Sequence, residues 1–360
     1  MAWQNKHRPR QVCDLHLKKV RDTLTAFMEN GKLPQVFLFA GPKGTGKTSS
    51  ARIIAALLND KKNEPLIDAI YFSGEKATGK FCEPSTDDSD LSQIFVGDSF
   101  AVVEMDAASN RRIEDVRNLQ ERIFMPSSVS KMTVYILDEA HMFTTEAFNA
   151  LLKILEEPPV HCVFILATTE KHKIPATVIS RCTVVDFVKA TSAELVSAFE
   201  KVLAKEKIEF DPKALELLAQ SVDGSFRDGI KTLETAAITG KVSLESVEQS
   251  LGSNIDQKVE QLLDLFLKKD GVKINQFFQE LRQSGISETF FYKTLLNYLH
   301  NQWLISLRVE EGTNKLSTKQ AVYLLTVFRD LKLDAPIGYL DIELKFYELL
   351  DKVTKKKSTA

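Results

Sequence analysis

The run GPKGTGKT at residues 41–48 constrains the fold more than any other stretch of this 360-residue chain. It matches the pattern G-x-x-x-x-G-K-[ST], follows the apolar run VFLFA, and opens the helical run SSARIIAALL. In that setting glycines let backbone N–H groups approach phosphate oxygens, and the helix N-terminus adds positive potential. A Gly-rich turn without function is the alternative, but strand, motif and helix stand in the required order. We therefore predict a strand–loop–helix unit that binds phosphates.

The phosphate loop also predicts individual roles. Lys47 would reach the terminal phosphates, and Thr48 would ligate Mg²⁺. The residues expected to surround the nucleotide phosphates are Gly41, Pro42, Lys43, Gly44, Thr45, Gly46, Lys47, Thr48 and Ser49. A second stretch, GEKATGKF at 74–81, repeats the glycine and lysine spacing but has Phe81 where Ser or Thr is needed. No apolar helix follows it, so we interpret it as a loop, like most of residues 60–92.

The first half of the chain alternates short apolar runs with helical stretches, which is typical of a parallel α/β sheet. The expected strands are 36–40, 101–105, 134–138, 162–167 and 183–187. They are nearly all apolar, as strands covered on both faces are. After about residue 188 the strand signal ends and helical periodicity takes over, with a break at Gly240-Lys241. We expect domains at 1–188, 189–243 and 244–360.

Composition and charge narrow the classes of function. With 47 basic and 49 acidic residues the formal charge is −2, so any DNA-binding surface must be a local patch. No apolar run approaches the roughly 18 residues of a membrane helix, and the polar, basic N-terminus has no signal-peptide core. The four cysteines, at 13, 82, 162 and 182, include no C-x-x-C pair. We expect a cytoplasmic protein with no disulfide framework and no membrane partner.

The run VYILDEAH at 134–141 predicts the catalytic carboxylates. Asp138, at the end of an apolar strand, can hold Mg²⁺ through water. Glu139 is placed to polarise the attacking water. An isolated Asp-Glu pair can be a solvated strand end, but beside a phosphate loop the catalytic interpretation is favoured. No N-K-x-D sequence for guanine is present, so ATP is the expected nucleotide.

Two further positions could sense the γ-phosphate. Thr169 is the second of two threonines after the apolar run CVFILA, although threonines there can simply cap a helix. Arg227, in GSFRDG, lies early in a helix of the second domain and could fold over the nucleotide. It could equally be a surface arginine paired with Asp223 or Asp228.

Together these stretches resemble the clamp-loader ATPase of bacterial DNA polymerase III, the gamma/tau family of the AAA+ superfamily. The likeness is closest within residues 98–187, in EMDAASNRRIEDVR, VYILDEAHMFTTEAFNALLKILEEPP and FILATTEKHKIPATVISRC. GSFRDG extends it to about residue 240, whereas 244–360 match only in length and helicity. The resemblance implies an α/β AAA+ P-loop domain with a five-stranded parallel sheet and flanking helices. A small helical lid domain and an all-helical C-terminal collar domain would follow.

The resemblance also implies partners. Five clamp-loader subunits would form a ring that opens a sliding clamp and loads it onto primer-template DNA, driven by ATP. The nucleotide lies between neighbours, so Arg181 of the SRC sequence would reach the γ-phosphate held by the next subunit. Its guanidinium is always charged and offers a planar fork suited to phosphate oxygens. A local ion pair with Glu170 or Asp186 is the alternative.

Three cations are expected to follow the DNA backbone. Arg111 and Arg112 are expected in the first turn of a helix, where cations oppose the helix dipole and suit a bound phosphate instead. Lys153 lies on the polar face of the helical run TTEAFNALLKILEE. The resemblance places all three on the inner surface of the ring, in contacts that do not read sequence. For Lys153 a plain solvated face is the alternative.

The chain departs from the family in two places. The family usually carries a four-cysteine zinc module after the P-loop helix, but residues 60–97 hold only Cys82. One thiolate cannot build a tetrahedral zinc site, so we predict no zinc. The chain keeps Arg8 and Pro9, which we assign to the nucleotide site, but lacks the Val-Gly-Gln sequence that the family has near the adenine.

Two rival functions remain beside the clamp loader. One is a scaffold subunit that binds ATP with little turnover. The intact Lys47, Asp138 and Glu139 argue against it, because a pure scaffold needs none of them. The other is a different AAA+ loader or motor that acts on DNA.

Overall fold

The computed structural model describes residues 2–73, 79–110, 112–124, 130–284, 286–310, 312, 315–333 and 337–358, with no side chains at 252–254 or beyond 352. The chain divides into two compact units. One comprises Met1–Ala198 and Ser225–Arg227, and the other Phe199–Gly224 and Asp228–Ala360. The three-domain division at 188 and 243 stays a prediction.

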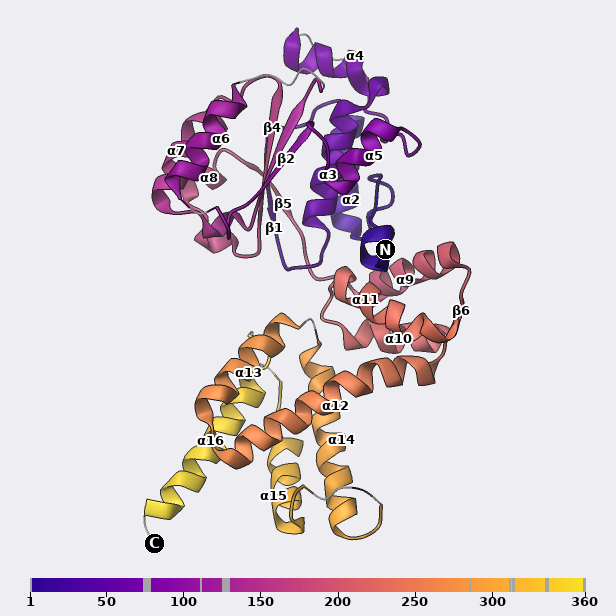
Figure 1. Ribbon diagram of the computed structural model, residues 1–360, viewed down its shortest axis with the longest axis vertical. Helices are drawn as coiled ribbons and strands as arrows, with labels where there is room; N and C mark the ends of the chain where they lie inside the picture. The colour runs from indigo at the N-terminus through magenta and orange to yellow at the C-terminus, as the bar shows by residue number, and fades with distance from the viewer. Residues whose placement is uncertain are drawn as a thin grey trace. The chain divides into compact units, whose positions relative to one another are not determined.

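The first unit is built around a five-stranded parallel sheet in the order β2-β3-β4-β1-β5 (Figure 1). Its strands are β1 (Val36–Ala40), β2 (Val102–Asp106), β3 (Thr133–Asp138), β4 (Cys162–Thr168) and β5 (Thr183–Asp186). Every residue of β1 and β4 is buried, because helices cover both faces of the sheet. The five expected strands are confirmed to within one residue at each end.

Helices lie on both faces of this sheet (Figure 1). One face carries α2 (Lys18–Glu29), α3 (Lys47–Asn59) and α5 (Ser89–Val96), and the other carries α6 (Ile113–Ile123), α7 (Thr145–Glu156) and α8 (Ala176–Ile179). The core under α6 and α7 includes the stacked rings of Tyr135 and Phe164, whose centroids are 5.2 Å apart. On α7, Phe148 and Leu151 are buried, whereas Leu152 is only half-buried.

The described part of residues 60–92 is helical at 61–72 and from 89 onward, so the loop prediction is wrong there, whereas residues 79–88 are irregular, as expected. It holds η1 (Lys61–Asn63), α4 (Glu64–Ile67) and the π-helical turn η2 (Asp68–Phe72). These turns are too short to show a hydrophobic periodicity, so the sequence pattern did not predict them. Of the stretch GEKATGKF, residues 74–78 lie outside the described residues. The remaining short elements of this unit are α1 (Trp3–Lys6), η3 (Ala140–Met142) and η4 (Lys171–Lys173).

The second unit is helical, as expected. Its helices are the later part of α9 (Ser192–Glu206), α10 (Pro212–Ser221), α11 (Phe226–Ala236), η5 (Ala237–Thr239), α12 (Leu244–Lys268), α13 (Gly271–Gln283), α14 (Glu288–Ser306), α15 (Thr318–Arg329) and α16 (Leu340–Ser358). Four fully buried phenylalanines help to form the core of the last five: Phe278, Phe291, Phe328 and Phe346. A short parallel ladder of β6 (Glu209–Phe210) and β7 (Lys241–Val242) was not expected, because two-residue strands leave no alternating pattern. No described helix is long and apolar enough to cross a membrane.

Candidate nucleotide site

The phosphate loop folds in conformations that favour glycine. Gly44 and Gly46 have φ angles of 73° and 101°, in the left-handed region. A Cβ at Gly44 would lie 2.0 Å from Ser225 Oγ, and the Gly44 carbonyl accepts the N–H of Phe226 at 3.0 Å. A Cβ at Gly46, which caps α3, would meet nothing within 4 Å. The space before this helix N-terminus is therefore open, as a phosphate requires.

Lys47 is a buried cation within the loop. Lys47 is the first residue of α3 and is 7% exposed. Its Nζ donates to the carbonyls of Gly41 at 2.7 Å and Pro42 at 2.8 Å. Burial lowers the pKa of Lys47, and the positive charges of Arg227 and Lys43 lower it further, while Glu139 and Asp138 act in the opposite direction. A phosphate oxygen near Nζ would stabilise the charged form, so this cradle fits an anionic ligand.

Thr48 and Asp138 meet at the carboxyl edge of the sheet. Thr48 Oγ1, in the first turn of α3, donates to Asp138 Oδ2 at 3.2 Å. A hydroxyl and a carboxylate are oxygen ligands of the kind that Mg²⁺ takes together with phosphates and water. Within the described residues, no group of three or more His, Cys, Asp or Glu could hold a metal. The pair therefore fits a metal whose other ligands come from the nucleotide and solvent.

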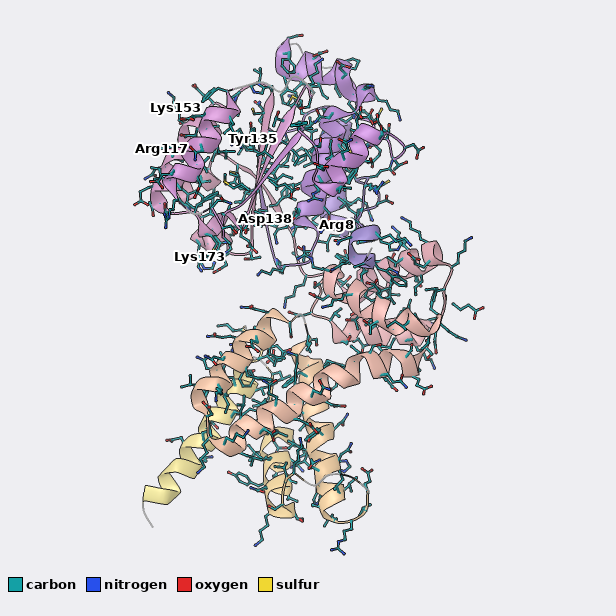
Figure 2. The ribbon with its side chains drawn as sticks, viewed as in Figure 1. Arg8, Arg117, Tyr135, Asp138, Lys153 and Lys173 are labelled. Carbon is teal, nitrogen blue, oxygen red and sulfur yellow. The ribbon has the colours of Figure 1, made fainter. Side chains whose placement is uncertain are left out.

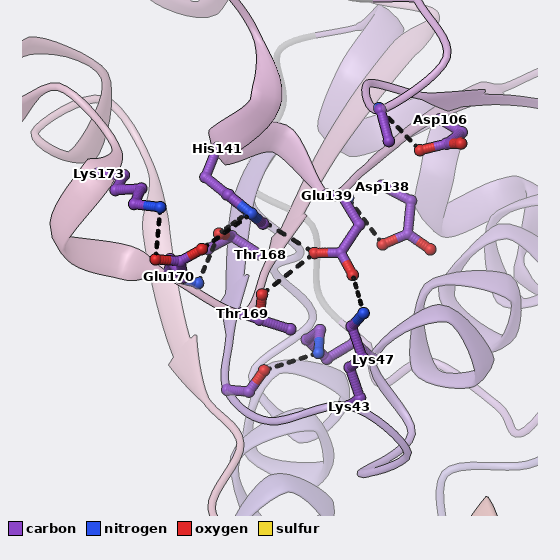
Figure 3. Close-up of polar contacts among 12 residues, drawn as sticks. Lys43, Lys47, Asp106, Asp138, Glu139, His141, Thr168, Thr169, Glu170 and Lys173 are labelled. Carbon is purple, nitrogen blue, oxygen red and sulfur yellow. Dashed lines mark hydrogen bonds and ion pairs between the residues drawn. The ribbon is translucent and has the colours of Figure 1, made fainter. Parts of the chain in front are cut away.

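Glu139 is held in a strained and specific position (Figure 3). Its φ of 46° lies in the left-handed region, which costs a non-glycine residue roughly 1–2 kcal/mol. Its Oε2 accepts a hydrogen bond from Thr169 Oγ1 at 3.2 Å, and its Oε1 is 3.9 Å from Lys43 Nζ. Strain of this kind persists where the surroundings enforce it and is frequent at functional sites. The structure thus brings Glu139 and Thr169 together.

His141 is part of this cluster but was not among the expected site residues. Its side chain is 7% exposed, and Nδ1 lies 3.0 Å from Thr168 Oγ1. The ring also lies within ion-pair distance of Glu139 and Glu170. The sequence signal for it is a histidine two positions after the proposed catalytic glutamate.

Arg227 lies at the phosphate loop rather than remote from it. Its backbone N–H is 3.4 Å from the Gly44 carbonyl, and its side chain is exposed. Arg8 is half-buried nearby, followed by the half-buried Pro9. Burial lowers the pKa of Arg8, as do the positive charges of Arg52 and Arg227. This concentration of positive charge suits a polyphosphate.

Arg181 contacts α7 and α8. Its guanidinium donates to the Thr177 carbonyl at 2.7 Å and pairs with Glu156 Oε2 at 3.1 Å. The local partner is therefore neither Glu170 nor Asp186, because these two carboxylates pair with lysines. Its Nε is buried and, within the described residues, has no hydrogen-bond partner.

Of the three candidate DNA-contacting cations, the structure describes Arg112 and Lys153. Arg112 is exposed and precedes α6 as its N-cap, with Glu114 and Asp115 in the first turn, so its expected place inside that turn is wrong. Arg111 lies outside the described residues. Lys153 is exposed on α7, and Figure 2 labels it on the side of the sheet that α6 and α7 cover.

Two family models match the chain in succession. The family described as DNA polymerase III, delta subunit, matches residues 17–191. The family described as DNA polymerase III clamp loader subunit, ATPase lid domain, matches residues 194–241.

Two individual relatives agree with these matches. The chain is 33% identical to DNA polymerase III subunit tau of Bacillus subtilis over 93% of its own length and 55% of the relative. It is 32% identical to DNA polymerase III subunit gamma of Buchnera aphidicola subsp. Baizongia pistaciae over 77% of its own length and 71% of the relative. A solved structure of the Thermotoga maritima RuvB branch migration motor aligns over 89% of this chain and 91% of its own at 15% identity, with a TM-score of 0.49.

The chain spans about half the length of the tau relatives it matches, but most of a gamma relative. Identity above 30% over such coverage, with a matching lid family directly after the P-loop unit, assigns the family. The chain belongs to the DNA polymerase III gamma/tau family.

Proposed function

We propose that the chain is an ATPase subunit of a clamp loader, which opens a sliding clamp and loads it onto primer-template DNA. The observation that carries this proposal is the meeting of two pairs at one sheet edge, Thr48 with Asp138 and Glu139 with Thr169. One pair is suited to a metal ion, and the other holds a carboxylate beside the phosphate loop. Family membership supplies the biological setting.

The residues of this site are proposed to have separate roles. Loop amides and Lys47 bind the phosphates, while Thr48 and Asp138 orient the ion. When bound, Mg²⁺ supplies charge neutralisation at the phosphates. Glu139 orients the attacking water and accepts its proton, with its carboxylate fixed by Thr169. Arg227, at the loop, is the proposed second sensor of the γ-phosphate.

Arg181 is proposed to serve the site of the next subunit in a five-subunit ring. Its present partner Glu156 has a side chain that is 60% exposed, and exposed ion pairs contribute only about 0–1 kcal/mol. Such a pair is easily exchanged for a phosphate oxygen. An arginine supplied in trans accelerates hydrolysis by roughly 10³–10⁵ in the GTPase systems where it is measured. Hydrolysis would then depend on an assembled interface.

Contacts with primer-template DNA are proposed for Arg111, Arg112 and Lys153. The exposure of Arg112 and Lys153 supports this, because a phosphate-binding cation must be reachable. Such contacts are independent of sequence and weaken with salt. A cytoplasmic location and the absence of zinc stay predictions.

An ATP-binding scaffold with little turnover is the main rival, and another AAA+ loader or motor is the second. A scaffold gains nothing from the strained backbone of Glu139. We expect the complex assembled with its partner subunits and primer-template DNA to hydrolyse ATP. Glu139→Gln should lower kcat at least about 10²-fold, the scale of general-base catalysis, while ATP still binds.

Glu216→Gln, at an exposed position of α10, is the matched control and should turn over like the wild type. Equal turnover by the Glu139→Gln and wild-type complexes would contradict the motor interpretation and favour the scaffold.

A further inference from the structure

His141 lies between two carboxylates (Figure 3). Its Nδ1 is 3.6 Å from Glu139 Oε2, and its Nε2 is 3.3 Å from Glu170 Oε1. The ring is 7% exposed, whereas the side chains of Glu139 and Glu170 are 24% and 36% exposed. A buried ring with both nitrogens occupied cannot shift toward one neighbour without weakening its contact with the other.

Thr168 contacts both His141 and Glu170. Its Oγ1 is 3.0 Å from His141 Nδ1 and also accepts the backbone N–H of Glu170 at 3.0 Å. Lys173 pairs with the Glu170 carboxylate at 2.7 Å and holds its pKa below the ordinary value. Glu170 therefore stays a carboxylate that can accept a hydrogen bond from the imidazole.

Two short hydrogen-bonded turns, η4 and α8, lie between Glu170 and Arg181 and are joined at Ile174-Pro175. The Lys173 N–H donates to the Glu170 carbonyl at 3.0 Å, and the Arg181 N–H donates to the Val178 carbonyl at 3.0 Å. Between them, Ile174 and Val178 are buried in the core. Movement of Glu170 would therefore be passed along the backbone to Arg181 rather than absorbed by a loose loop.

We propose that His141 is a positioning residue that couples Glu139 to the segment 170–182, so that the nucleotide state of this chain's own site sets the placement of Arg181. This rests on the proposed function, because it needs ATP at one site and the arginine at the next.

The first test uses the full chain alone, in which no neighbour engages Arg181. Hydrogen exchange of residues 170–182 is measured with and without the non-hydrolysable analogue AMP-PNP and Mg²⁺. The analogue should change exchange in the wild type, and His141→Ala should abolish that response while its affinity for AMP-PNP stays within about twofold. His172→Ala is the matched control, because that exposed histidine lies 3.8 Å from the same Glu170 carboxylate. A full response in His141→Ala, or equal loss in His172→Ala, would overturn the proposal.

The second test uses the assembled complex with DNA. His141→Ala should lower kcat by up to about 10²-fold, the loss that misplacement of a catalytic group can cause, with KM little changed. His141→Gln, whose amide can still reach Glu170, should recover part of the loss. A raised KM at unchanged kcat would instead assign His141 to nucleotide binding and overturn the inference. If neither the wild type nor any variant binds AMP-PNP, the proposed function itself is contradicted, and the coupling that rests on it is contradicted too.

Discussion

Gly41 and Gly46 illustrate how differently two glycines of one loop are constrained. A Cβ at Gly41 would lie 1.9 Å from the carbonyl oxygen of Phe187, a backbone atom that follows β5. At Gly46 no atom lies within 4 Å of such a Cβ, and only the φ of 101° disfavours a side chain. The first glycine is required by packing and the second by conformation.

This difference predicts unequal costs of substitution. Gly41→Ala should destabilise the first unit by about 3 kcal/mol or more, because the sheet must shift to admit the methyl group. Gly46→Ala should cost only about 1–2 kcal/mol from backbone strain. Urea denaturation of the nucleotide-free chain, followed by hydrogen exchange of β1 and β5, measures both. A larger loss for Gly46→Ala than for Gly41→Ala would contradict this account of the loop.

At the scale of elements, the segment between α3 and β2 is held by buried side chains bonded to backbone. The Asn63 carboxamide accepts the N–H of Cys82 at 2.7 Å and donates to the carbonyls of Cys82 and Leu57, both at 3.0 Å. Asp60 accepts the N–H of Ser85 at 2.7 Å. These bonds join residues 60–63 to residues 82–85. Both lie in the stretch where the resembling family usually carries its zinc module.

Asn63→Ala should destabilise this segment by about 1–3 kcal/mol, because it removes the three hydrogen bonds of a buried carboxamide. Hydrogen exchange of residues 79–85 should become faster. Asn118→Ala, at an exposed position of α6, is the control and should change stability by less than about 0.5 kcal/mol. Unchanged exchange in the Asn63 variant would show that other contacts hold the segment.

The elements that the sequence predicted well are those with a strong physical signal. The five strands are apolar on both faces, and the carboxyl ends of β1, β3 and β4 meet at one edge because the sheet is parallel. That edge brings Lys47, Asp138 and Thr169 together. The β6–β7 ladder was too short to leave a pattern, and α6 begins two residues later than expected because Asp115 accepts the Arg112 N–H.

Contacts between distant side chains could not be predicted from pattern. The pairing of Arg181 with Glu156 joins residues 25 positions apart, and that of His141 with Glu170 depends on how η3 packs against the end of β4. Neither contact has a periodicity or motif that would indicate it. They follow only from the packed arrangement of α7, α8 and the sheet.

At the scale of the whole molecule, the chain holds most of one nucleotide site and one arginine proposed for another. Lys47, Asp138 and Glu139 gather at the phosphate loop, whereas the contacts of Arg181 are to α7 and α8. If Arg181 serves the neighbouring site as proposed, ATP is hydrolysed only by assembled subunits. The central claim is therefore that catalysis belongs to an interface between subunits.

Mixed complexes test that claim most directly. Subunits carrying Arg181→Ala are assembled beside intact neighbours, and ATP binding and turnover are measured at each site. The account predicts that turnover at the neighbour's site falls by about 10³-fold or more, while the variant subunit binds its own ATP as the wild type does. Loss of ATP binding by the variant subunit itself, with full turnover at the neighbour's site, would contradict it.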